Sequence, residues 1–122
     1  MHTSFHTTVR HAGNGRTVVD VVGDLDVVTA KLLFDQGCWL LADGHRDLLL
    51  DMSGLTFCDS SGLSTIINLW QRAEQAGGDL ALVAITDRLA GMLRVTATDT
   101  LITVHPATEL GHLAPPVATE PA

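Results

Sequence analysis

Residues 50–63 decide the fold, and they read Leu50-Asp51-Met52-Ser53-Gly54-Leu55-Thr56-Phe57-Cys58-Asp59-Ser60-Ser61-Gly62-Leu63. The stretch begins inside Asp47–Asp51, an apolar run between charged ends that is typical of a central strand covered on both faces. Residues 52–54 then predict a turn. Residues 59–61 are three consecutive N-cap types, and apolar residues follow at helical spacing: Leu63, Ile66, Ile67, Trp70 and Ala73. The segment therefore predicts a strand, a loop and a helix that ends at Gly77-Gly78.

Upstream of this segment the chain predicts a β-hairpin and a helix. Phe5–Arg10 and Thr17–Val22 are rich in Val and Thr, and the Gly13-Asn14-Gly15 turn between them tolerates positive φ. The segment Gly23-Asp24-Leu25-Asp26 is expected to break the second strand. Thr29 is then expected to cap a helix from Ala30 to Asp43, which Gly44 ends.

Downstream the β-α pattern repeats. Leu80–Ala84 predicts a buried strand, and Thr86 or Asp87 can cap a helix that carries Leu89, Met92, Leu93 and Val95. Leu101–His105 predicts the last strand, and a short helix is expected near Thr108. Residues 1–113 are expected to form one domain, and residues 114–122 a disordered C-terminal tail.

A hairpin followed by strands that alternate with helices indicates the α/β class. We expect a single domain in which about four helices flank a mixed, mostly parallel sheet that starts with the N-terminal hairpin. The 122 residues fit one such domain.

The charge balance argues against two classes of partner. Seven Lys and Arg against fourteen Asp and Glu give a net charge of −7, which repels nucleic acid and anionic membranes. No stretch reaches the ~18 apolar residues of a membrane span, and the N-terminus lacks a signal-peptide pattern, so we expect a cytoplasmic protein. Cys38 and Cys58 have no C-x-x-C spacing and are expected to be buried, reduced thiols.

The common catalytic signatures are absent from the sequence. It contains no phosphate loop, dinucleotide fingerprint, H-E-x-x-H or nucleophile elbow. The six histidines are scattered, so no metal site is expected, and no cofactor either. Asp24 and Asp26 are expected to form a polar strand end and not to work as an acid/base pair. We therefore expect a non-enzymatic protein, with a serine-nucleophile enzyme that uses Ser61 as an outside alternative.

The densest group of functional residue types lies at Cys58–Leu63, where a loop after the central strand enters a helix. Unpaired N–H groups and the positive end of the helix dipole allow a hydroxyl there to carry or contact a phosphate. A helix cap with spare serines is the alternative reading. Projected at ~100° per residue, Ser61 falls on the polar arc near Asn68 and Ser60 at its edge, which favours Ser61 as the accessible hydroxyl.

The helix expected at residues 30–43 has an unusual outer face. Its main apolar arc holds Ala30, Leu33, Phe34, Gly37, Cys38, Leu40 and Leu41. Leu32 and Trp39 fall outside that arc, seven residues apart and among polar residues. Either they are isolated exposed apolar residues, which are common, or they dock a partner chain or a second copy.

Over residues 5–113, the sequence resembles a STAS domain of the anti-sigma factor antagonist type. Residues 50–63 match the family's strand, loop and D-S-S-G-L helix start. Gly23-Asp24-Leu25-Asp26 is similar to its G-x-L-D segment, and Gly77-Gly78-Asp79-Leu80 to its turn before the fourth strand. The chain departs from the family at Thr96–Leu101, where a Gly-Leu pair often follows the third helix.

The resemblance implies a phosphorylation-switched binding protein. The second serine of D-S-S-G, here Ser61, would accept phosphate from a partner that is an anti-sigma factor and a serine kinase of the histidine-kinase-like ATPase fold. The unphosphorylated form would bind that kinase and free a sigma factor, and a serine phosphatase could act as a further partner. The expected partner surface comprises Asp26, Asp59, Ser60, Gly62, Leu63, Leu32 and Trp39. The alternative is a STAS module that senses a small ligand or nucleotide within a larger signalling assembly.

Overall fold

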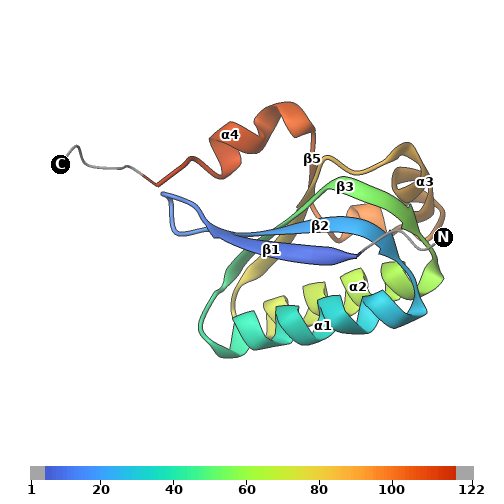
Figure 1. Ribbon diagram of the computed structural model, residues 1–122, viewed down its shortest axis with the longest axis horizontal. Helices are drawn as coiled ribbons and strands as arrows, with labels where there is room; N and C mark the ends of the chain where they lie inside the picture. Colours follow the sequence, from blue (N-terminus) through green and yellow to red (C-terminus); the bar gives the residue numbers. More distant parts are fainter. Residues whose placement is uncertain (1–4, 118–122) are drawn as a thin grey trace.

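The computed structural model describes residues 5–117 and shows five strands and four α-helices (Figure 1). The strands are β1 (His6–His11), β2 (Thr17–Leu25), β3 (Asp47–Cys58), β4 (Asp79–Val83) and β5 (Val104–His105). The helices are α1 (Val27–Ala42), α2 (Ser60–Gln75), α3 (Asp87–Val95) and α4 (Leu110–Leu113), with 3-10 turns at Thr98–Thr100 and Ala107–Glu109. The expected single α/β domain is confirmed.

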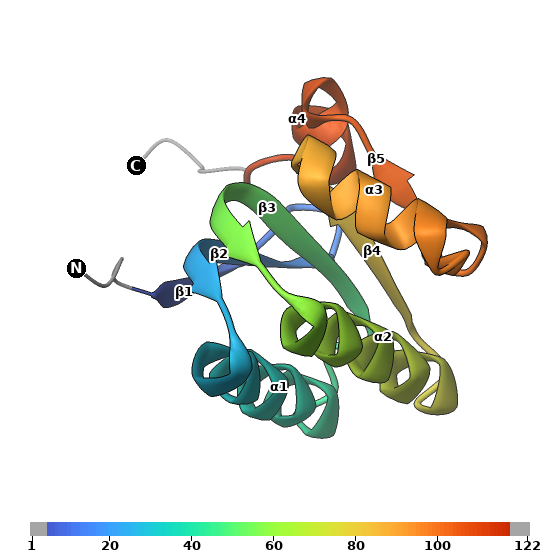
Figure 2. The same ribbon diagram turned by 90° about the vertical axis from the view of Figure 1, so that its right-hand side faces the viewer.

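The strands form one sheet in the order β1-β2-β3-β4-β5. β1 pairs with β2 antiparallel, which confirms the N-terminal hairpin, and all other neighbours are parallel. Figures 1 and 2 show α1 and α2 side by side under one face of the sheet and α4 on the opposite face. Because β2, β3 and β4 are parallel, their carboxyl ends lie at the same end of the sheet, where the helix starts gather.

The main core lies between the sheet and helices α1, α2 and α3. Its fully buried large side chains include Leu25, Leu33, Leu40, Leu50, Met52, Ile66, Leu69, Leu80, Leu82, Leu89 and Leu93. The two long helices approach closely at Gly37, where a methyl group would lie 2.5 Å from Cδ2 of Leu69. A smaller cluster on the other face joins Val18, Leu49, Ala81, Val83 and Ala114.

Two strands run further than the sequence predicts. β2 continues through Leu25 and is not broken at Gly23, and β3 continues through Cys58 and does not turn at residues 52–54. The two strands pair in parallel over this extra length, with Val22 opposite Gly54 and Leu25 opposite Cys58. The pairing of β2 with β3 shifts register between Asp20 and Val22 and again between Gly23 and Asp24. Backbone N–H and C=O groups that a turn would pair locally are instead paired between the two strands.

Two other boundaries are corrected. Helix α1 begins at Val27, because Asp26 and not Thr29 is its N-cap. Thr29 instead completes a capping box, in which its hydroxyl accepts a hydrogen bond from the Asp26 backbone N–H. The last strand is only Val104–His105, because Leu101 closes the 3-10 turn through the Thr98 carbonyl.

The C-terminal segment lies against the hairpin turn. The Gly13 N–H donates to the Pro115 carbonyl at 2.8 Å, and the side chains of Asn14 and Arg16 donate to the Leu113 carbonyl. Residues 114–117 of the predicted disordered tail therefore belong to the fold, since Pro115 is hydrogen-bonded to Gly13. Residues 118–122 of that tail lie outside the described residues.

Candidate functional site

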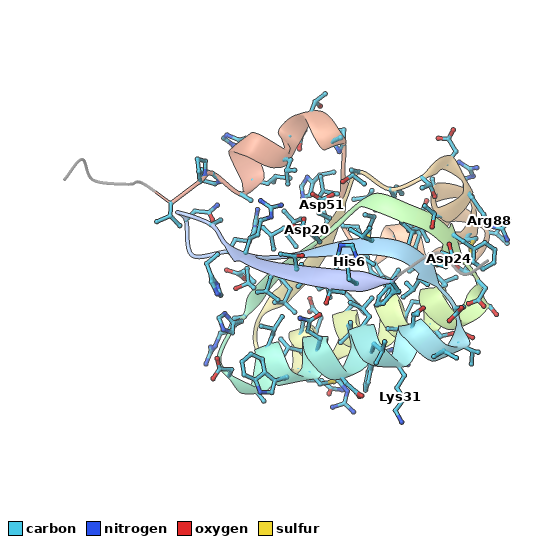
Figure 3. All side chains as sticks on the ribbon, in the orientation of Figure 1. His6, Asp20, Asp24, Lys31, Asp51 and Arg88 are labelled. Carbon is cyan, nitrogen blue, oxygen red and sulfur yellow. The ribbon has the colours of Figure 1, made fainter. Side chains whose placement is uncertain are left out.

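The D-S-S-G segment lies at the carboxyl end of the parallel strands, at the junction of β3 and α2. β3 ends at Cys58, Asp59 is the N-cap, and Ser60 and Ser61 are the first two residues of α2. Figure 3 shows Asp24 and Arg88 at this same end of the molecule. This is the end at which open α/β sheets bind their ligands.

The Asp59 side chain caps the N-terminus of α2. Its Oδ1 accepts hydrogen bonds from the backbone N–H groups of Ser61 at 2.9 Å and Gly62 at 3.1 Å. The sequence predicts unpaired N–H groups here for a phosphate, and that prediction is wrong for the N–H groups of Ser61 and Gly62. The carboxylate occupies the position at the helix terminus that an anion would otherwise take.

The two serines point into different grooves on either side of α2. Ser60 is exposed and Ser61 is partly buried, so the helical projection that favoured Ser61 as the more accessible hydroxyl is wrong on exposure. The difference comes from the neighbouring helices, because Ser61 faces α1 whereas Ser60 faces α3.

Ser61 lines a polar groove of about 400 Å³ between α1 and α2. The other lining residues are Val27, Ala30, Lys31 and Phe34 from α1, and Ser64, Thr65 and Asn68 from α2. Each set is spaced i, i+3, i+4, i+7 along its helix, so two facing stripes form the walls. Lys31 supplies the cationic group of this groove.

Ser60 lines an apolar groove of about 480 Å³ between α2 and α3. Its other lining residues are Leu63, Arg88, Gly91, Met92, Arg94, Val95 and Thr96. The guanidinium carbon of Arg88 lies 5.2 Å from the centroid of the Phe57 ring, within the range of a cation–π interaction. An apolar floor beside two arginines suits a ligand or segment that is apolar and anionic.

The remaining predicted partner residues divide into exposed and structural positions. Leu32 is 55% and Trp39 63% exposed on the outer face of α1, as the helical projection predicts. Asp26 accepts from the N–H groups of Val28 and Thr29 and so caps α1. Asp24, which is not predicted to form an acid/base pair with Asp26, accepts a hydrogen bond from the Thr56 hydroxyl.

Gly62 and Leu63 lie inside the molecule, which corrects their placement on the partner surface. A methyl group on Gly62 would lie 2.7 Å from Sγ of Cys58 and 2.9 Å from Leu25. Leu63 is 7% exposed and contributes only to the floor of the Ser60 groove. Their place in the D-S-S-G-L motif is explained by packing, since only glycine fits against Cys58.

The Cys58 side chain lies at the end of β3, directly before the D-S-S-G segment. Burial, reinforced by the Asp59 carboxylate and opposed by Arg88, raises the pKa of the Cys58 thiol to about 11, so this thiol is protonated at neutral pH. Within residues 5–117, the hydrogen-bonded histidines His45 and His105 contact other groups than the serines. The same residues contain no cluster of three metal-ligating side chains and no helix long and apolar enough to cross a membrane.

Sequence reasoning missed Lys31, Arg88 and Phe57. A signal for Lys31 was available, because Val27, Ala30, Lys31 and Phe34 share the helical stripe that faces α2. The contact between Arg88 and Phe57 joins α3 to the end of β3, and it depends on tertiary structure that local spacing does not encode.

Comparison with known proteins places this geometry in a family. The family model described as "STAS domain" matches residues 7–110. The chain is 27% identical over 92 residues to the anti-sigma-B factor antagonist of Staphylococcus aureus, covering 75% of this chain and 85% of that protein.

Solved structures give the same answer for the fold. The crystal structure of an anti-sigma factor antagonist from Mycobacterium paratuberculosis superimposes with a TM-score of 0.75 at 25% identity, covering 84% of this chain and 86% of that one. The Bacillus cell fate determinant SpoIIAA in its phosphorylated form gives a TM-score of 0.71 at 16% identity, covering 90% and 96%. With a family match that spans most of the molecule, the chain belongs to the STAS domain family.

Proposed function

We propose that this STAS domain is an anti-sigma factor antagonist switched by phosphorylation of Ser61. In its unphosphorylated form it binds an anti-sigma factor serine kinase of the histidine-kinase-like ATPase fold and so frees a sigma factor in the bacterial cytoplasm. The observation that carries the proposal is the serine hydroxyl of a D-S-S-G helix start at the carboxyl end of the sheet. The similarity to named anti-sigma factor antagonists supports it.

The proposed switch works through charge and leaves the fold intact. The partner kinase transfers the γ-phosphoryl group of ATP to Oγ of Ser61, and the hydroxyl proton and ADP leave. The phosphate adds ~1.5–2 negative charges beside Asp59, whose carboxylate already holds the helix N–H groups. A partner surface that fits a hydroxyl must then desolvate a dianion, which costs ~2–5 kcal/mol of binding free energy unless the partner supplies a matching cation.

The direct test is incubation with a candidate anti-sigma factor kinase and ATP, followed by intact-mass measurement and phosphosite mapping. We expect one phosphate on wild type and on Ser60→Ala, and none on Ser61→Ala, which should still bind the kinase. Ser61→Asp should fold normally and bind the kinase poorly. Phosphate on Ser60, or wild-type kinase binding by Ser61→Asp, would overturn the assignment of the switch.

The second candidate is a sensor of a small ligand. The apolar groove beside Ser60, with Arg88 and Arg94 on its walls, is the observation that favours it. Such a protein would bind an apolar anion whatever the state of Ser61. Binding of such a compound by calorimetry, together with no modification by any candidate kinase, would favour this reading.

A further inference from the structure

A phosphate on Ser61 would enter a site that already holds a carboxylate. The inference drawn from this rests on the proposed phosphorylation of Ser61. Asp59 takes the N–H groups of Ser61 and Gly62, so these donors do not hold the phosphate. Asp59 also adds a like charge next to it, so the phosphate needs a cation from another element.

The groove between α1 and α2 offers one such cation. Ser61 begins the α2 stripe of that groove, and Lys31 lies on the facing α1 stripe. Figure 3 shows Lys31 projecting from α1 on the side away from the sheet. Lys31 is the only lysine in the sequence, and among the ion pairs of residues 5–117 none involves it. Its flexible four-carbon chain can turn toward a new anion without breaking an existing pair.

The other charged groups near the start of α2 are committed elsewhere. Arg88 lies over the Phe57 ring and lines the groove of Ser60. Arg72 lies over the Phe34 ring, about three helical turns beyond Ser61. The carboxylate of Asp26 caps α1 through Val28 N–H and Thr29 N–H. Of these groups, Lys31 alone is both cationic and a wall of the Ser61 groove.

We propose that Lys31 is the counter-ion of phosphoserine 61. Its ammonium group crosses the mouth of the groove and pairs with the phosphoryl oxygens, above the polar side chains of Ser64 and Asn68. The phosphate is thereby held along the seam between α1 and α2. The unmodified Ser61 hydroxyl is uncharged and needs no counter-ion, so Lys31 pairs with Ser61 only in the phosphorylated state.

The test installs phosphoserine at position 61 during translation, so that no kinase is required. Phosphorus NMR then measures the pKa of the phosphate, which is about 6 for a free phosphoserine. Removal of a pairing cation should raise that pKa by about 0.5, as expected for a partly exposed ion pair. We therefore expect a higher pKa in Lys31→Gln and a wild-type pKa in Lys31→Arg, at low ionic strength.

Two controls make the result specific. Arg72→Gln removes a cation further along the same seam and should leave the pKa of phosphoserine 61 unchanged. Phosphoserine installed at position 60 faces the other groove and should not respond to Lys31→Gln. The same pKa in Lys31→Gln and wild type, or an equal response at position 60, would overturn the role of Lys31. Failure of candidate kinases to modify Ser61 would instead contradict the proposed function. That result is independent of this titration, because the titration uses no kinase.

Discussion

Gly62 and Cys58 are in contact across the junction of β3 and α2, with no room for a side chain between them. A methyl group on Gly62 would lie 2.7 Å from Sγ of Cys58, and Leu25 closes the other side at 2.9 Å. This contact sets how closely the first turn of α2 approaches the sheet. The position of the two serines depends on it.

Gly62→Ala should therefore destabilise the domain. Alanine favours a helix by about 1 kcal/mol, but the overpacking of Cys58 and Leu25 should cost about 1–3 kcal/mol and shift the start of α2. Gly111→Ala is the matched control, because a methyl group there has no neighbour within 4 Å. Urea unfolding of both variants measures the difference. A Gly62→Ala protein as stable as Gly111→Ala would refute the packing argument.

The raised pKa of Cys58 predicts a loss of stability at high pH. The thiol ionises near pH 9 in the unfolded chain and near pH 11 in the fold, because burial disfavours the thiolate. Between these values the unfolded state loses its proton first, so the free energy of unfolding should fall by up to about 3 kcal/mol as pH rises from 9 to 11.

Cys58→Ala should remove that part of the pH dependence, and Cys38→Ala should retain it. Urea unfolding at a series of pH values from 8 to 11 provides the measurement. Equal slopes for Cys58→Ala and wild type would show that the thiol does not contribute.

Ala97 predicts a stabilising substitution. It follows the C-cap of α3 with φ of +57°, a left-handed conformation that costs a residue with a Cβ about 1–2 kcal/mol. Ala97→Gly should raise stability by about 0.5–1 kcal/mol after the greater freedom of glycine in the unfolded chain is counted.

Ala90→Gly, in the middle of α3, supplies the opposite control and should lose about 1 kcal/mol. Thermal unfolding of the two variants should therefore move in opposite directions. A lower melting temperature for Ala97→Gly than for wild type would contradict the assignment of strain to this turn.

Trp39 tests the outer face of α1 as a partner surface. If Leu32 and Trp39 dock a partner chain or a second copy, Trp39→Ala should weaken complex formation by about 1–3 kcal/mol while the melting temperature stays close to wild type. Leu33→Ala on the buried face should instead lower the melting temperature strongly. Calorimetric binding by a folded Trp39→Ala protein at wild-type affinity would show that the exposed pair Leu32 and Trp39 is incidental.

The order of the elements was predictable, because each depends on a local pattern. Alternating Val and Thr, glycine turns and apolar residues at helical spacing predict the hairpin, the parallel strands and the faces of α1 correctly. The errors occur where pairing between distant segments overrides a local preference. Ser53 and Gly54 have turn propensity, yet they continue β3 because β2 supplies a parallel neighbour.

The candidate site shows the same division. The sequence identifies the D-S-S-G helix start and the exposure of Leu32 and Trp39. It does not identify which groove each serine enters, because that depends on where α1 and α3 pack beside α2. The sequence identifies Asp59 as a residue type that caps helices. It does not show that the Asp59 carboxylate accepts the hydrogen bonds of Ser61 N–H and Gly62 N–H.

The hydrogen bond from the Gly13 N–H to the Pro115 carbonyl holds the last described residues against the hairpin turn. Figure 1 shows this C-terminal segment at the end of the sheet opposite the start of α2. A protein immobilised through this end of the sheet would therefore present the serine pair away from the support. Surface-based binding assays built with that orientation leave both grooves accessible to a soluble kinase, whereas attachment near α1 or α3 would obstruct them.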